Sequence, residues 1–180
     1  MAGGHAFIDE STAGDYLLVC SVVPPGSVND ARSTMRGLLL KGQRSLHMKD
    51  ESDQRRHNIL RTIQSLEPSA TLYRARPRDY RGPKGARDAC IRQAAHDGVD
   101  LRLQRMILDK IDSLVARDRA AIIAGAASAG ARVVPFDYDH MQRHEEPLLW
   151  IADALAWSYA RGGSFRAQAA GLLRVVDLRP

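Results

Sequence analysis

The sequence predicts an α/β fold. Short apolar runs typical of β-strands alternate with longer segments in which apolar residues recur at helical spacing. The chain has 180 residues, 44% of them hydrophobic and 26% charged, which suffices for one domain with a sizeable core. No internal repeat, low-complexity tract or linker divides it, so we expect residues 1–180 to form a single domain.

The first half of the chain is predicted to begin with a β-hairpin. Residues 5–9 (HAFID) and 16–23 (YLLVCSVV) are strand-like, and Ala13-Gly14-Asp15 between them is typical of a tight turn. The second strand is apolar almost throughout, which favours a central place in the sheet. There follow a helix over 27–40 with Ser27 as its N-cap, a short strand over 44–48, a helix over 53–66 and a strand over 70–75.

The second half begins with a stretch rich in Pro, Gly and Arg (residues 76–87), which predicts a loop. Pro135 assigns the strand expected over 132–137 to an edge of the sheet. The other expected elements are a helix over 88–96, a strand over 105–109 (RMILD), an alanine-rich helix over 113–129 and a helix over 146–161 that Gly162-Gly163 ends. Residues 172–178 are either a further strand or a docked tail.

Bulk charge and cysteine content narrow the class of protein. The formal net charge is +5 and the pI is about 9.6, which favours a polyanionic partner.

No apolar run approaches the ~20 residues of a membrane span, so no membrane partner is expected. The first residues (MAGGHAFIDES) do not have the pattern of a signal peptide. Cys20 and Cys90 form neither a disulfide framework nor a zinc motif, and a cytoplasmic protein is expected. Nothing in the sequence indicates the oligomeric state.

Asp153 is the single polar residue in the apolar part of the helix expected over 146–161. Ten of the eleven residues 147–157 (PLLWIADALAW) are apolar, so the helix is expected to be buried. A buried carboxylate must be paired, protonated or bound to a metal. A salt bridge is therefore one explanation for Asp153, and a metal site is another.

Other acids follow predicted strands. Asp9 ends the first strand, Glu10 follows it, and Asp109 ends RMILD. Strand ends in α/β sheets are where ligands gather. Together with Asp153 these carboxylates could bind Mg²⁺ or Mn²⁺, and a pair of such ions about 4 Å apart can promote phosphodiester hydrolysis. Alternatives stay open: Asp9 as a turn cap, Lys110 neutralising Asp109, and Glu10 as an exposed charge on the opposite face rather than a second ligand.

Four motifs over about residues 5–160 resemble a known family. FIDES before a hairpin, LHMK, ILDK and EPLLWIAD are similar to motifs of the domain of unknown function 3800 family. The resemblance implies a ribonuclease-H-like fold, in which a mixed sheet is flanked by helices. It also implies a metal-dependent nuclease whose ions are held by Asp9, Asp109 and Asp153. The chain departs from the family pattern in its longer turn after FIDES and in Trp150, which replaces a Gln.

His47 lies where the family often has a histidine. It is a candidate general base, phosphate contact or metal ligand. The alternative is a partly buried histidine that the backbone satisfies.

A basic stretch is the candidate nucleic-acid interface. Residues 73–92 contain seven basic side chains, with Tyr73 and Tyr80 interleaved. Arginines bind phosphates and tyrosines stack on bases, although a solvated basic loop is the alternative. The predicted nucleic-acid-binding residues are Arg74, Arg76, Arg78, Arg81, Lys84 and Arg87.

Three functions are compatible with these patterns. The first is a nuclease using two divalent ions at Asp9, Asp109 and Asp153, with Glu10 as a further ligand. The second is a non-catalytic module that binds nucleic acid or protein on the same fold. The third is a phosphoester hydrolase that acts on nucleotides and does not need the basic stretch.

Overall fold

A six-stranded mixed sheet forms the centre of the computed structural model, which describes residues 3–180. Its strand order is β5-β4-β1-β2-β3-β6. The strands β1, β2 and β3 pair antiparallel, whereas β4, β5 and β6 each run parallel to their neighbours. The predicted mixed sheet is therefore confirmed. The strands are β1 (His5–Ser11), β2 (Tyr16–Val23), β3 (Ser69–Ala75), β4 (Arg105–Asp109), β5 (Asp137–Met141) and β6 (Leu173–Asp177).

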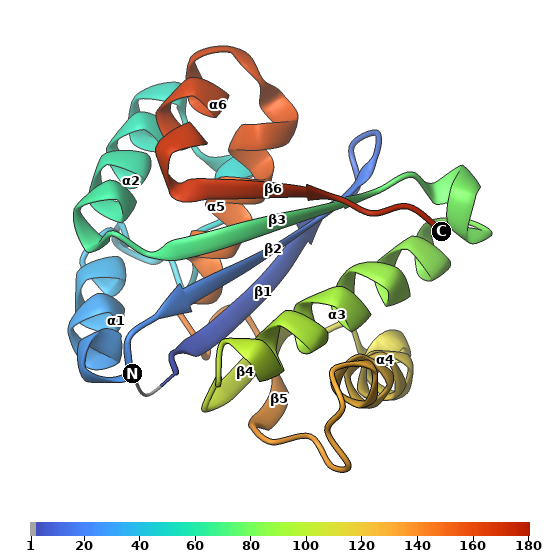
Figure 1. Cartoon of the computed structure of the whole chain (residues 1–180). Helices are drawn as coiled ribbons and strands as arrows, with labels where there is room; N and C mark the ends of the chain where they lie inside the picture. Colours follow the sequence, from blue (N-terminus) through green and yellow to red (C-terminus); the bar gives the residue numbers. More distant parts are fainter. Residues whose placement is uncertain (1–2) are drawn as a thin grey trace.

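Helices cover both faces of the sheet (Figure 1). One face packs against α1 (Val28–Arg36), α2 (Asp53–Leu66), α5 (Leu149–Arg161) and α6 (Gly163–Ala169). The other face packs against α3 (Pro83–Asp100) and α4 (Val115–Ser128). Each layer encloses its own cluster of buried apolar side chains. Among residues 3–180 no helix is both long and apolar enough to cross a membrane.

Side chains alternate in direction along β1, so Asp9 and Glu10 point toward opposite faces of the sheet. Phe7 belongs to the cluster under α5, and Ile8 belongs to the cluster under α3 and α4. Since successive strand residues point to opposite faces, Asp9 follows Phe7 toward α5. Glu10 follows Ile8 toward α3, where Arg87 contacts it.

The strand predicted over residues 44–48 is wrong. The chain bends there and forms a short 3-10 turn at Met48–Asp50. Leu46 and Met48 are buried in the core cluster that includes α2 and α5. Their alternate burial imitates a strand pattern, but both side chains pack against helices while the segment pairs with no strand.

The strand predicted over residues 132–137 is also wrong. Val133 is 78% exposed and Pro135 has no N–H to donate, so pairing with β4 begins only at Asp137. The polar segment from Asp137 to Met141, which is typical of a loop, forms this edge strand instead. An edge strand tolerates such polar residues because part of it faces solvent.

Several boundaries differ from those predicted. The expected loop over 76–87 ends early, because a 3-10 turn spans Pro77–Tyr80 and α3 begins at Pro83 and runs to Asp100. Proline is tolerated in the first helical turn, where its missing N–H has no partner to lose. The apolar helix predicted over 146–161 begins at Leu149 rather than at 146. The helix α6 was not predicted, and the C-terminal segment is a strand rather than a docked tail.

Candidate functional site

Three of the predicted acids meet where the neighbouring strands β1 and β4 end. Asp9 lies in β1 and Asp109 ends β4, and these strands are parallel neighbours. Asp153 lies in the first half of α5, which packs across β1. The fold therefore brings together three carboxylates from distant parts of the sequence.

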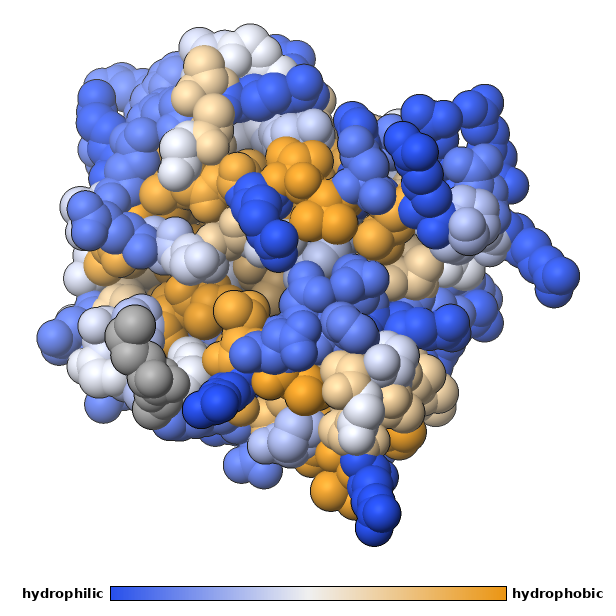
Figure 2. All heavy atoms as spheres, viewed as in Figure 1, coloured by the Kyte–Doolittle hydropathy of each residue, from blue (hydrophilic) through white to orange (hydrophobic). Residues whose placement is uncertain are grey.

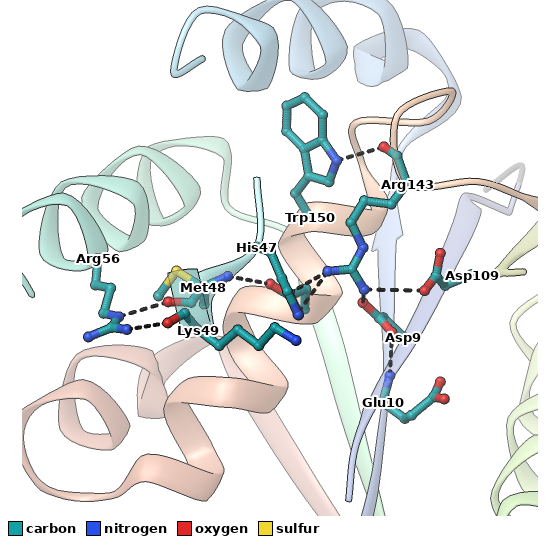
Figure 3. Close-up of polar contacts among 10 residues, drawn as sticks. Asp9, Glu10, His47, Met48, Lys49, Arg56, Asp109, Arg143 and Trp150 are labelled. Atoms are coloured by element: carbon teal, nitrogen blue, oxygen red, sulfur yellow. Dashed lines mark hydrogen bonds and ion pairs between the residues drawn. The ribbon is translucent and has the colours of Figure 1, made fainter. Parts of the chain in front are cut away.

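The guanidinium of Arg143 links all three carboxylates. Figure 3 shows its contacts with Asp9 and Asp109. Arg143 Nη2 lies 3.1 Å from Asp9 Oδ2 and 3.2 Å from Asp109 Oδ2. Its Nη1 lies 3.5 Å from Asp153 Oδ1. The indole Nε1 of Trp150 donates to the backbone oxygen of Arg143 at 2.7 Å and anchors the loop that carries it.

Asp153 has further partners in the segment before α2. The backbone N–H of Met48 donates to Asp153 Oδ2 at 2.8 Å, and His47 Nδ1 lies 2.8 Å from Asp153 Oδ1. The guanidinium of Arg143 also contacts His47 Nδ1. This nitrogen either donates to the carboxylate or accepts from the guanidinium, so it serves one partner at a time.

Burial makes the negative charge of this cluster costly. The pKa of Asp9 lies well above its ordinary value, first because the carboxyl is buried and then because Asp153 is close, while Arg143 opposes the shift. The backbone N–H of Glu10 donates to Asp9 Oδ1 at 2.8 Å. Three carboxylates face a single guanidinium, so the cluster retains a demand for positive charge. Within residues 3–180 no three His, Cys, Asp or Glu side chains are already arranged as a metal cage.

Glu10 borders the cluster but bonds to the opposite layer. Its Oε1 lies 2.8 Å from Arg87 Nη1. Burial raises the pKa of Glu10, and the charge of Arg87 opposes this rise. Glu10 also lines a cavity of about 240 Å³ together with His47, Lys49 and Asp153. It thus lies between the buried ion pair and the opening beside the acids.

The expected phosphate contact of Arg87 is not compatible with its position. Arg87 is only 1% exposed. Its Nε and Nη2 donate to the two oxygens of Asp118 at 2.8 and 2.9 Å, and its Nη1 donates to the Tyr16 hydroxyl at 3.0 Å. His140 Nε2 lies 3.0 Å from the same Asp118. The buried Arg87 side chain therefore connects its own helix, α3, to β1, β2 and α4.

The other predicted basic residues lie at the surface, from the end of β3 to the start of α3. Arg74 is half-buried and pairs with Asp177. Four residues are exposed and available to a polyanion: Arg76, Arg78, Arg81 and Lys84.

Sequence reasoning missed Arg143. It belongs to a polar stretch (QRHEE) between β5 and α5 that has no recognisable motif. The available signal was the arrangement of the acids, because two buried carboxylates, Asp9 and Asp153, next to the partly buried Asp109 need a cation, and β5 ends beside β4.

Comparison with known proteins identifies the architecture. No family model matches the chain, and no curated protein matches it. Ribonuclease HII, from the structure of its complex with PCNA from Archaeoglobus fulgidus, superposes with a TM-score of 0.60 at 17% identity, over 88% of this chain and 73% of that one. This chain has a ribonuclease-H-like fold. The Q54A mutant of Bst ribonuclease HIII matches with a TM-score of 0.52 at 13% identity, over 86% of this chain and 51% of that one.

The ribonuclease-H-like fold was predicted from the four short motifs, and it is confirmed. The chain spans about half the length of the ribonuclease HIII structure. At such low identities the likeness establishes the fold alone.

Proposed function

We propose that the chain is a metal-dependent nuclease that hydrolyses phosphodiester bonds of nucleic acid. The observation that carries the proposal is the convergence of Asp9, Asp109 and Asp153 on one cation, the guanidinium of Arg143. The resemblance of four short motifs to those of the domain of unknown function 3800 family supports the same assignment.

The donor chemistry suits Mg²⁺ or Mn²⁺. Carboxylate oxygens are the hard ligands that these ions prefer. The guanidinium marks a place where positive charge is stabilised between carboxylates, and it belongs to a long side chain on a loop. Its withdrawal would leave Asp9, Asp109 and Asp153 to hold the metal, with Glu10 at the border of the site.

When bound, divalent ions at such a site activate water and stabilise the charge that develops on the phosphate. The chain's own residues position the reactants. Met48 N–H fixes the orientation of the Asp153 carboxylate. While Nδ1 of His47 is engaged by Asp153, Nε2 is the nitrogen left to exchange a proton or to donate to a phosphate. Once displaced, Arg143 is also available to bind a phosphate oxygen.

A second candidate function also draws support from Arg143. If the guanidinium neutralises the acids permanently, the chain is a non-catalytic nucleic-acid-binding module. In that case the carboxylates are structural, and binding depends on the exposed basic residues.

Cleavage assays with substituted acids test the first proposal. Labelled RNA, DNA and RNA–DNA hybrids are incubated with Mn²⁺ and the wild type, Asp9→Asn or Asp153→Asn. Each variant is expected to lose cleavage by at least about 100-fold, the upper end of the cost of losing even an outer-sphere partner of a metal. Asp137→Asn, an exposed acid on β5, is the matched control and should cleave normally.

Circular dichroism and thermal unfolding confirm that the variants fold. Wild-type rates in both folded variants would contradict the nuclease proposal. Salt-dependent binding that survives EDTA, without cleavage of any substrate by the wild type, would favour the binding module.

A further inference from the structure

A cavity beside the carboxylates shares part of its lining with a second cavity. The first, of about 240 Å³, is lined by Glu10, His47, Lys49 and Asp153 and extends to the hairpin turn and Trp157. The second, of about 260 Å³, shares Ser11, Ala13 and Trp157 with the first and adds Arg161. The opening at the acids therefore continues past Trp157 along the end of α5.

Two further cavities continue the same path. The third, of about 120 Å³, shares Ala13 and Ala160 with the second and adds Arg74 and Arg166. The fourth, of about 440 Å³, begins at Arg74 and lies at the ends of β3 and β6. We call the four together the basic groove, and its basic side chains are Lys49, Arg161, Arg166, Arg74, Arg76 and Arg179.

The length of the basic groove follows from the sheet topology. The groove runs from the end of β1, past β2 and β3, to the end of β6, and these four strands are consecutive in the sheet. Three strand spacings amount to about 14 Å. A stacked nucleic-acid strand rises about 3.4 Å per nucleotide, so this distance corresponds to about four nucleotides.

The charge of the groove favours a polyanion. Away from the acids its lining contains five arginines and three aspartates. Within residues 3–180 no carboxylate lies within 4.0 Å of Arg76, Arg161 or Arg179. Asp177 is the counter-charge at the far end, and its pKa is lowered first by the hydrogen bond from Arg74 and also by Arg76 and Arg179. Figure 2 shows hydrophilic side chains gathered around this C-terminal end of β6.

We propose that the basic groove seats about four nucleotides of one nucleic-acid strand, on one side of the phosphate held at the carboxylates. Small side chains at Ala13 and Ala160 leave room for sugars and bases. Lys49 near the acids and the arginines at the far end contact phosphates. The proposal rests on the proposed function, because it takes the acids as the place where the strand is cut.

Binding of fluorescein-labelled oligonucleotides in EDTA tests the groove without any cleavage. Oligothymidylate and oligouridylate of increasing length are titrated into the wild type and Arg76→Ala/Arg179→Ala at several salt concentrations. Two lost phosphate contacts should reduce the slope of log affinity against log salt by about 1.4, since each contact contributes about 0.7 on a single strand. The affinity ratio of wild type to variant should then grow about 25-fold between 1 M and 0.1 M salt.

Length dependence makes the test specific to the groove. Dinucleotides cannot span the distance from the acids to Arg76, so their binding should not respond to the substitutions. The matched control is Arg119→Ala/Arg132→Ala, which removes two exposed arginines in and just after α4 and the same net charge. It should bind oligonucleotides of every length nearly as well as the wild type.

Two outcomes would overturn the groove: an unchanged salt slope in Arg76→Ala/Arg179→Ala, or an equal change in the control. Neither depends on cleavage. A reduced slope in a chain that cuts nothing would support the groove and contradict the nuclease. Loss of cleavage in Asp153→Asn with an unchanged slope in the groove variant would support the nuclease and contradict the groove.

Discussion

At the scale of single residues, the central feature is the partnership between Asp153 and Arg143. The carboxylate is tolerated in an apolar helix because a backbone N–H, a histidine and a guanidinium surround it. A buried charge without such partners would cost several kcal/mol. The sequence indicates that Asp153 needs a partner, which is either a salt bridge or a metal. The structure shows an ion pair in the place where the proposed metal would bind.

Asp9 should make stability depend on pH in a specific direction. Its folded pKa is raised above the ordinary value of 3.8, so between these two values the folded chain holds a proton that the unfolded chain has lost. Stability should therefore fall as pH rises through the folded pKa, by up to about 1.4 kcal/mol per pH unit in that window. Asp9→Asn should remove this contribution. Urea unfolding of both proteins across pH, with Asp137→Asn as control, measures it.

The pH prediction would fail if the stability difference between wild type and Asp9→Asn were the same at every pH. That result would mean that burial does not raise the pKa of Asp9 in the folded chain.

The Arg87 ion pairs should be essential to stability. Arg87→Met would leave the fully buried Asp118 and the partly buried Glu10 without their guanidinium, which costs about 3–5 kcal/mol. Arg78→Met, whose side chain is 77% exposed, should change stability little. Urea denaturation compares the two variants, and a loss below about 1 kcal/mol in Arg87→Met, within the range of an exposed pair, would refute the structural role.

At the scale of elements, the sequence predicted best where one periodicity dominated. The predicted ranges of β2, α2 and β4 match the structure. Prediction failed where tertiary context decides. Leu46 and Met48 have strand-like alternation but pack under helices, and the polar β5 is a strand only because β4 offers it an edge.

Packing between α3 and α4 depends on Gly125. A Cβ at this position would lie 2.2 Å from the backbone oxygen of Arg92, so Gly125→Ala would push the helices apart. We expect a loss of about 1–3 kcal/mol, typical of overpacking. Gly171→Ala, where a Cβ would meet nothing within 4 Å, is the control and should be close to neutral. Equal stability of both variants would show that the helices tolerate a wider separation.

At the scale of the whole molecule, the fold gathers acids that the sequence keeps apart. The topology aligns the ends of β1 and β4, and α5 crosses β1, so Asp9, Asp109 and Asp153 could be proposed as a group from their elements alone. The cation between them could not be proposed from the sequence, because Arg143 lies in a loop whose position only the folded sheet defines. The same fold occurs in the ribonuclease HII and HIII structures. Under the proposed function, what this chain does depends on which cation the acids hold.

The most direct test of that claim is the effect of Mn²⁺ on the thermal unfolding of wild type and Arg143→Gln. Without metal, the variant should unfold at a lower temperature, because three carboxylates lose their cation. With Mn²⁺, its Tm should rise more than that of the wild type, since the competitor is gone; tenfold tighter binding adds about 1.4 kcal/mol. Lys110→Gln, which removes an exposed charge paired with Asp112, should respond like the wild type. A Tm that Mn²⁺ changes in neither protein would contradict the account and leave Arg143 as the permanent cation of a site that binds no metal.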